Sequence, residues 1–451
     1  MSRTVLRGAR WPGDVAMSEG RITAVGSMPA EEGDEVVRVD GDIVTAGLVN
    51  THHHFYQWMT RGWACDSTLF EWLVTLYPVW AQVTPEDVEA AAAVALGELA
   101  LSGCTTAADH HYVVPDGDDS VFDAIARSAR RIGIRAHIAR GSMDLGESKG
   151  GLPPDSVVED LDAILASTQS VYERLHDGER ISITVAPCSP FSVTTELMSE
   201  SAALARSLGL RLHTHLAETL DEEENCLVRF GKRPLGVLDD LGWIASDVWV
   251  AHGIHFDDAE VARLGATGTG IAHCPSSNCR LGSGIARVVD LTAAGAPVGL
   301  GVDGVASNEI GTLFPEMRMA LFLARQRDLS ATTFGPTDVL RIATEGGARC
   351  LGRDDIGRLE PGYRADVVVW PGDDLADVLD PLAGLVLGPE RRARHVFVEG
   401  GYVVRDGHLV GADMPALRRD LARRARRLWP DGPTERGPAP GTGSERGSAT
   451  A

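Results

Sequence analysis

The sequence predicts a parallel β/α architecture, either a closed (β/α)8 TIM barrel or an open doubly wound sheet, with a small β-sandwich domain formed by both chain ends. Three observations predict this fold. Eight short apolar runs alternate with segments of helical period between residues 43 and 303. Residues of the metal-ligand type stand at the ends of several runs, and both flanks read as short alternating strands with glycine-rich turns.

The expected barrel strands lie in the runs 43–53, 104–111, 134–142, 181–188, 211–218, 248–256, 270–277 and 298–304. Helices are expected between most of them, at 85–101, 122–132, 156–175, 195–208 and 286–294. Thr84 and Pro85 form a suitable N-cap and first turn for one helix. Left-handed C-caps are expected at the glycines that close four helices, which are Gly103, Gly133, Gly209 and Gly295.

Four segments follow from this pattern. Residues 48–357 form the barrel, while 1–47 and 358–412 form the two parts of the sandwich domain. Residues 413–451 hold a basic helix, ALRRDLARRARRLW, and a tail rich in Gly, Pro and Ser that we expect to be disordered. We expect the basic face of that helix to be solvated, with an interaction surface as the alternative.

Composition limits the possible partners. The formal net charge of −22 disfavours nucleic acid and anionic lipid and favours a small-molecule substrate. Seven scattered cysteines without a CxxC pair suggest neither disulfides nor a zinc ribbon, so we expect a reducing cytoplasm. The N-terminus lacks a signal-peptide core, and no apolar run approaches the ~18 residues of a membrane span.

The stretch NTHHHFYQ (50–57) places three histidines after the first apolar run. On a strand, His52 and His54 share one face and His53 points to the other. His215, His252 and Asp303 end the fifth, sixth and eighth runs. Because the carboxyl ends of barrel strands converge on one pocket, we expect a mononuclear metal site from His52, His54, His215 and Asp303.

The segment HTHLAE (213–218) places His213 on the same face as His215, with Glu218 three residues further on. If the chain turns over the pocket there, this carboxylate lies near the metal without being a ligand. That position suits a general acid/base.

Other chemical motifs are weaker. GLGVDG (299–304) matches GxGxxG, but it does not open directly into a helix and does not belong to a first βα turn. The HxE and PCxxC signature of small nucleoside deaminases is absent, and so is a GxSxG elbow.

The strings NTHHH, HTHLAE, AHGIH, HCPSSN and LGVDGVASN resemble, in this order, the amidohydrolase superfamily, in its branch of metal-dependent aminohydrolases that act on purines, pterins and triazines. The resemblance spans residues 1 to about 412 and implies a distorted barrel with one divalent ion, zinc or alternatively iron. It also implies that His52, His54, His215 and Asp303 are ligands, Glu218 a proton shuttle and His252 a partner to the attacking water. His110, His111, His255 and His273 are expected to have supporting or structural roles.

The resemblance further implies a hydrolytic deamination by a metal-activated hydroxide. Asp303 takes a proton, and His252 orients the oxygen that attacks a ring carbon bearing an amino group. Glu218 protonates the neighbouring ring nitrogen, and ammonia leaves.

The strings HHHFYQ, FEWLVTLYPVW, GCTTAADHH and RGSMDLGESKGGLPPDSVVED are most similar to 8-oxoguanine deaminases, whose relatives are often labelled hydroxyatrazine aminohydrolases. In the similar guanine deaminases, a glutamine at the spacing of Gln57 helps to read the purine edge. Cys188, which we expect to line the substrate pocket, stands where those enzymes have an arginine, and this difference weighs against guanine itself. The aromatic stretch 70–80, Trp80 included, is expected to stack on a planar heterocycle, or alternatively to pack as an amphipathic segment on the barrel.

The expected function is therefore deamination of an aminopurine, 8-oxoguanine first, in a cytoplasmic homo-oligomer. Alternatives are guanine, isoguanine or pterin substrates, and an alkylamino-triazine that loses an alkylamine. A noncatalytic assembly protein and a dehydrogenase that relies on GLGVDG are further alternatives from other classes.

Overall fold

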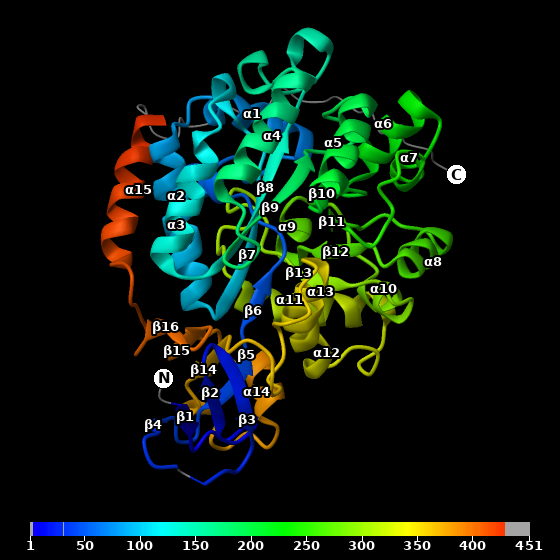
Figure 1. Cartoon of the computed structure of the whole chain (residues 1–451). Helices are drawn as coiled ribbons and strands as arrows, with labels where there is room; N and C mark the ends of the chain where they lie inside the picture. The colour runs from blue at the N-terminus through cyan, green and yellow to red at the C-terminus, as the bar shows by residue number, and fades with distance from the viewer. Residues whose placement is uncertain (1–2, 30, 429–451) are drawn as a thin grey trace.

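The computed structural model describes residues 3–29 and 31–428 and contains a closed barrel of eight parallel strands (Figure 1). In chain order these strands are β6 (Leu48–Asn50), β7 (Cys104–His111), β8 (Arg135–Ser142), β9 (Ile181–Pro187), β10 (Arg211–Leu216), β11 (Val248–His252), β12 (Gly270–His273) and β13 (Val298–Leu300). β13 pairs with β6 and closes the circle. The barrel prediction is confirmed, and the open doubly wound sheet is excluded.

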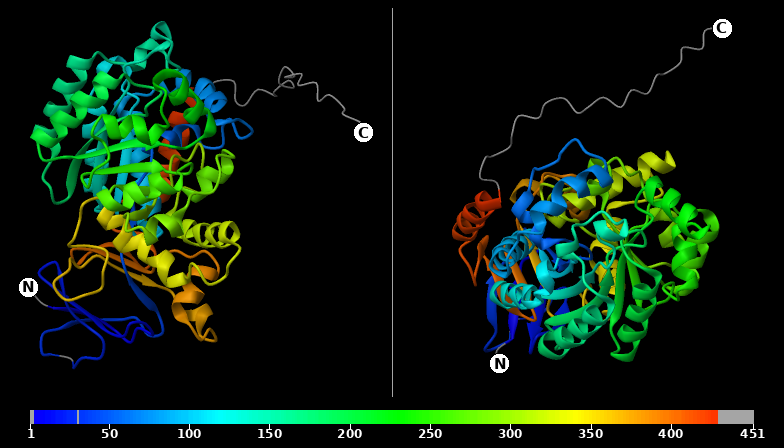
Figure 2. Two further views of the ribbon diagram at one scale, coloured as in Figure 1. Left: turned by 90° about the vertical axis from the view of Figure 1, so that its right-hand side faces the viewer. Right: turned by 90° about the horizontal axis from the view of Figure 1, so that it is seen from above.

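Helices surround this barrel, as the view from above shows (Figure 2). They are α1 (Leu69–Trp80), α2 (Pro85–Leu101), α3 (Ser120–Ile132), α4 (Leu161–Leu175), α5 (Thr195–Ser207), α6 (Leu220–Phe230), α7 (Pro234–Asp240), α8 (Asp258–Thr267), α9 (Pro275–Arg280), α10 (Val288–Ala293), α11 (Leu313–Asp328), α12 (Pro336–Arg341) and α13 (Gly347–Cys350). Thr84 caps α2 by accepting a hydrogen bond from the Asp87 amide. Gly103, Gly133, Gly209 and Gly295 all have positive φ, as their positions after helices predict.

The first predicted strand is two strands in the structure. β5 (Ile43–Ala46) pairs with β14 (Val367–Trp370) in the small domain, and β6 begins the barrel. The chain passes between them at Gly47, where an added Cβ would lie 2.1 Å from the Thr105 Oγ1 atom. The run is uniformly buried, so apolar patterning alone does not mark the crossing point.

The small domain contains two sheets from both ends of the chain (Figure 2). One has the order β3 (Arg21–Val25), β2 (Val15–Ser18), β1 (Thr4–Arg7) and β4 (Glu35–Arg38). The other has the order β17 (His408–Leu409), β16 (Gly401–Arg405), β15 (His395–Val398), β14 and β5. Apolar side chains of both ends form its core. The helix α14 (Pro381–Leu387) lies between β14 and β15 in the chain and packs against α11 and α12.

The small domain lies at the amino end of the barrel strands, opposite the end where the polar residues gather. Arg135, the first residue of β8, forms ion pairs with Asp366 and Glu399 of the small domain. Because the carboxyl ends of the strands point the other way, the domain leaves that mouth of the barrel uncovered.

The basic C-terminal helix is α15 (Met414–Leu428), which packs along α2 (Figure 1). Its apolar side chains are buried, and Arg418 donates to the buried Glu98 carboxylate at 2.6 and 3.0 Å. Most of the basic face is solvated, because all its arginines except the half-buried Arg424 are exposed, although Arg418, Arg424 and Arg427 also pair with the buried Glu98 or Asp87. The predicted disordered tail, from residue 429, lies outside the described residues. None of the described helices has the length and apolar character needed to cross a bilayer.

Candidate metal centre and active site

The four predicted ligands meet at the carboxyl end of the barrel. His52 and His54 follow β6, His215 lies in β10, and Asp303 follows β13. The Nε2 atoms of His54 and His215 are 3.1 Å apart. Oδ1 of Asp303 lies 3.2 Å from Nε2 of His54 and 3.4 Å from Nε2 of His52. All four side chains are buried, and their potential ligand atoms lie close together.

The hydrogen bonds of His54 and His215 show which of their ring nitrogens are free to bind a cation between these side chains. Nδ1 of His54 donates to the carbonyl of His110, and Nδ1 of His215 donates to the carbonyl of Cys188, both at 2.6 Å. A neutral imidazole that donates from Nδ1 has only a lone pair at Nε2. Two lone pairs and a carboxylate oxygen therefore face one another, and a divalent ion that prefers N and O ligands would resolve this repulsion.

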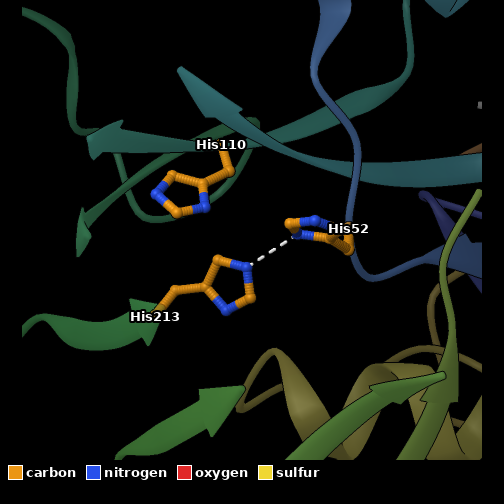
Figure 3. A group of neighbouring side chains, drawn as sticks. All are labelled: His52, His110 and His213. Carbon is orange, nitrogen blue, oxygen red and sulfur yellow. Dashed lines mark hydrogen bonds between the residues drawn. The ribbon is translucent and has the colours of Figure 1, made fainter. Parts of the chain in front are cut away.

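His52 is oriented by a second histidine (Figure 3). Its Nδ1 lies 2.9 Å from Nε2 of His213, whose own Nδ1 donates to the Trp249 carbonyl at 2.9 Å. Because His213 donates from Nδ1, its Nε2 accepts from Nδ1 of His52. Nε2 of His52 therefore carries a lone pair and no proton on the side that faces Asp303. His110, also drawn in Figure 3, lies beside this pair and donates from Nε2 to the Ala186 carbonyl.

His52, His110 and His213 also bring three ring nitrogens within 4.8 Å of one another. The hydrogen bond between His52 and His213 already accounts for their closeness, so we read this group as a support for the ligands rather than as a second metal site.

Asp303 is held by α9, which follows β12, and by the turn that follows β13. Its Oδ2 accepts from Ser277 Oγ at 2.6 Å and from Ser307 Oγ at 3.1 Å, while Oδ1 accepts from the Gly304 amide at 2.7 Å. The residue has φ 60°, a left-handed conformation that is uncommon outside glycine. Both serines lie in strings that carried the family resemblance, HCPSSN and LGVDGVASN, but their hydrogen bonds are visible only in the structure.

Glu218 and His252 face each other beside the predicted ligands. Oε2 of Glu218 is 3.6 Å from Nε2 of His252, and Nδ1 of His252 donates to Oδ1 of Asn278 at 2.9 Å. Burial of the Glu218 carboxyl, with the nearby Asp303 carboxylate, raises its pKa well above the ordinary value. A buried carboxyl group of this kind can carry a proton at neutral pH.

These groups line a cavity that opens to solvent and measures about 410 Å³ when the open space at its mouth is included. His54, His215, Glu218, His252 and Asp303 form its polar side, together with Cys188 and Ser189. The apolar side consists of Leu69, Trp72, Leu73, Tyr77, Tyr112, Phe191 and Leu281. An apolar slot with converging polar groups at one end is suited to a planar heterocycle with one reacting edge.

The predicted substrate-binding residues occupy three different positions. Cys188 lies in the cavity wall. Trp80 does not, because its ring lies behind the wall and donates from Nε1 to Thr60 Oγ1 at 3.0 Å. Trp72 and Tyr77, from the same helix, line the cavity instead. Helical periodicity places all three rings on the buried face of α1, but only tertiary packing decides which part of that face meets the cavity.

Gln57 is fully buried behind the cavity wall, in a turn of 3₁₀ helix at Phe55–Thr60. Within the described residues, neither atom of its amide has a hydrogen-bond partner at normal geometry. The amide oxygen lies only 1.7 Å from the point where a Cβ on Gly304 would stand, so the side chain packs against the turn after Asp303.

Comparison with known proteins identifies the family. Residues 43–403 match the model of the Amidohydrolase family. The chain belongs to this family. The predicted resemblance is therefore confirmed at the level of the family.

The proteins similar to this amidohydrolase include a deaminase, an ethylaminohydrolase and a chlorohydrolase. It is 49% identical to 8-oxoguanine deaminase of Pseudomonas aeruginosa, over 92% of this chain and 97% of the relative. It is 38% identical to hydroxydechloroatrazine ethylaminohydrolase of Pseudomonas sp. strain ADP, over 80% of this chain and 78% of the relative. The crystal structure of atrazine chlorohydrolase from Arthrobacter aurescens TC1 complexed with zinc has a TM-score of 0.89 and 30% identity, with 94% and 100% of the two chains covered.

Proposed function

We propose that this protein is a metal-dependent aminohydrolase that converts 8-oxoguanine and water into urate and ammonia. The observation that carries the proposal is one cavity in which an apolar slot ends at Glu218, His252 and three of the predicted ligands, His54, His215 and Asp303. The similarity to 8-oxoguanine deaminase over nearly the whole of both chains supports the choice of substrate.

We propose zinc as the divalent ion, held by Nε2 of His52, His54 and His215 and by Oδ1 of Asp303. The zinc complex of the similar atrazine chlorohydrolase supports this choice. When bound, such an ion lowers the pKa of a water molecule towards neutrality and so supplies a nucleophile.

Three side chains would then handle the protons. The Asp303 carboxylate is pinned by Ser277 and Ser307 at Oδ2, which leaves Oδ1 on the side of the histidine ligands. The Asp303 carboxylate accepts a proton from the attacking water. His252, fixed through Nδ1, presents Nε2 to the attacking oxygen.

Glu218 delivers a proton to the ring nitrogen next to the carbon that bears the amino group. Protonation there prevents negative charge from building up on the ring while the carbon becomes tetrahedral. The proton taken up by Asp303 passes to the amino group, which leaves as ammonia. The second proton of the former water returns to Glu218, and its oxygen remains as the carbonyl of urate.

A hydroxylated alkylamino-triazine is the second candidate substrate. The similarity to hydroxydechloroatrazine ethylaminohydrolase favours it, and the same residues would release an alkylamine in place of ammonia. The identity of the released amine therefore separates the two candidates.

The test is amine release by the zinc-loaded protein against matched concentrations of 8-oxoguanine, guanine, isoguanine and a hydroxylated ethylamino-triazine, with Glu218→Gln as the inactive control. We expect ammonia and urate from 8-oxoguanine, with the largest kcat/KM of the four. Ethylamine release from the triazine, with no turnover of any purine, would overturn the proposed substrate.

We further propose that the protein works as a cytoplasmic homo-oligomer. All seven cysteines are unpaired, which suits a reducing compartment. Light scattering coupled to size-exclusion chromatography tests the oligomeric state, and a monomeric mass at working concentration would contradict it.

A further inference from the structure

Glu222 is a buried carboxylate next to the active site that takes no part in the mechanism above. It lies in the first turn of α6, only 1% of its surface is exposed, and it does not line the catalytic cavity. A buried carboxylate is costly unless hydrogen bonds compensate for the lost water. Its partners therefore indicate what it does.

The Glu222 carboxylate holds two consecutive backbone amides. Oε1 accepts from the Ala217 amide at 3.0 Å, and Oε2 accepts from the Glu218 amide at 2.8 Å. In an ordinary capping box, a glutamate at this position of the first turn would accept from the backbone of the N-cap residue, here Thr219. Glu222 instead reaches past Thr219 to the two residues that precede it. It therefore fixes the peptide that carries Glu218 rather than the start of the helix alone.

The same peptide is also tied to the loop that follows His252. Ala217 has φ 52°, a left-handed conformation that needs support from its surroundings in a residue other than glycine. Its carbonyl accepts from the amides of Ile254 and His255, at 2.9 and 3.1 Å. The amide of Ala217 is thus held by Glu222 and its carbonyl by the loop that follows His252.

We propose that Glu222 is a positioning residue that sets the place of the Glu218 carboxyl relative to His252. This inference rests on the proposed proton transfer by Glu218. Glu222 does not line the cavity in which the substrate would bind, and its carboxylate accepts from backbone amides. It acts through the backbone of residues 217 and 218.

The test is Glu222→Gln, which keeps the length of the side chain but replaces one acceptor oxygen with an NH2 group that cannot accept from an amide. Glu224→Gln, on the exposed face of the same helix, is the matched control. A displacement of the catalytic group by ~1 Å can cost about 100-fold, so we expect kcat to fall by roughly 10- to 100-fold. KM and zinc content should stay within about twofold of the wild-type values.

A double-mutant cycle separates positioning from general stability. If Glu222 acts through Glu218, Glu222→Gln adds no further loss of kcat in the Glu218→Gln background. Additive losses, or an unchanged kcat in the single variant, would overturn the inference. If Glu222→Gln does not fold, Thr219→Ala replaces it in the cycle, because the Thr219 hydroxyl accepts from the Glu222 amide at 3.2 Å and holds the first turn.

The cycle is measured with whichever heterocycle the wild-type protein turns over best. A wild-type protein that ignores 8-oxoguanine but acts on another member of the panel contradicts the proposed substrate only. The behaviour of Glu222→Gln with that compound then still decides the role of Glu222.

Discussion

Replacement of His213 by alanine tests how the hydrogen-bond network sets the metal affinity. The change removes the acceptor of the His52 Nδ1–H group, at 2.9 Å, in a place where both rings are at most 1% exposed. His52 then loses the protein partner that fixes its tautomer and orientation. Loss of such an outer partner typically weakens metal binding about 10- to 100-fold. This range corresponds to about 1.4 to 2.7 kcal/mol.

The assay is zinc competition against a chromophoric chelator at pH 7. Alanine also removes the stacking of His213 on Trp249, with ring centroids 4.4 Å apart, so a control for lost packing is needed. His137→Ala provides it, because this histidine is also buried, in β8, but does not belong to any of the predicted ligand groups. His213→Gln should recover part of the affinity, since its amide oxygen can accept from His52. Unchanged zinc affinity in His213→Ala, or an equal loss in His137→Ala, would refute the reasoning.

Three further predictions concern the ligands, the proton shuttle and the pH dependence of stability. His215→Ala should lose bound zinc while His53→Asn, which keeps an acceptor for the His54 amide, should retain it; equal metal content by elemental analysis would contradict this. Glu218→Gln should keep zinc but lose about 10²- to 10⁴-fold in kcat, and near-normal turnover would exclude Glu218 as the proton donor. Burial opposes ionisation of Asp355, but hydrogen bonds from Arg353 and Arg364 outweigh it and lower the pKa of this carboxyl. The stability that the ionised group contributes is therefore fully present above the ordinary pKa of about 3.9 and is lost as the pH falls through the lower pKa of the folded state. Urea denaturation of Asp355→Asn should therefore show its largest deficit near neutral pH, and a deficit that grows on acidification would contradict this sign.

The patterns of the chain were sufficient to predict the barrel and the residues that meet at its mouth. Helix 85–101 appears with the predicted bounds, because its N-cap and its C-terminal glycine are local signals. His52, His54, His215 and Asp303 meet for a topological reason. Parallel strands that alternate with helices bring their carboxyl ends to one side of a closed barrel, whatever the details of packing. Their roles as ligands stay predictions until metal is measured.

Long-range packing decided the rest. Trp72 and Tyr77 reach the cavity and Trp80 does not, although one helical period places them on the same face. The crossing of the chain at Gly47 depends on the proximity of Thr105, far away in sequence. The basic helix packs on α2, where its arginines pair with buried acids such as Glu98.

The residues that hold the site residues in place were also set by long-range packing. The sequence alone placed His213 beside His215 on one face, but not its hydrogen bond to His52, 161 residues earlier in the chain. Nor does a glutamate in the first turn of a helix reveal that it reaches past the N-cap to hold Glu218. Periodicity and spacing determine which residues face a common point, because they depend on the geometry of single elements. The partner of each side chain depends on distances between elements, and these are fixed only when the barrel closes.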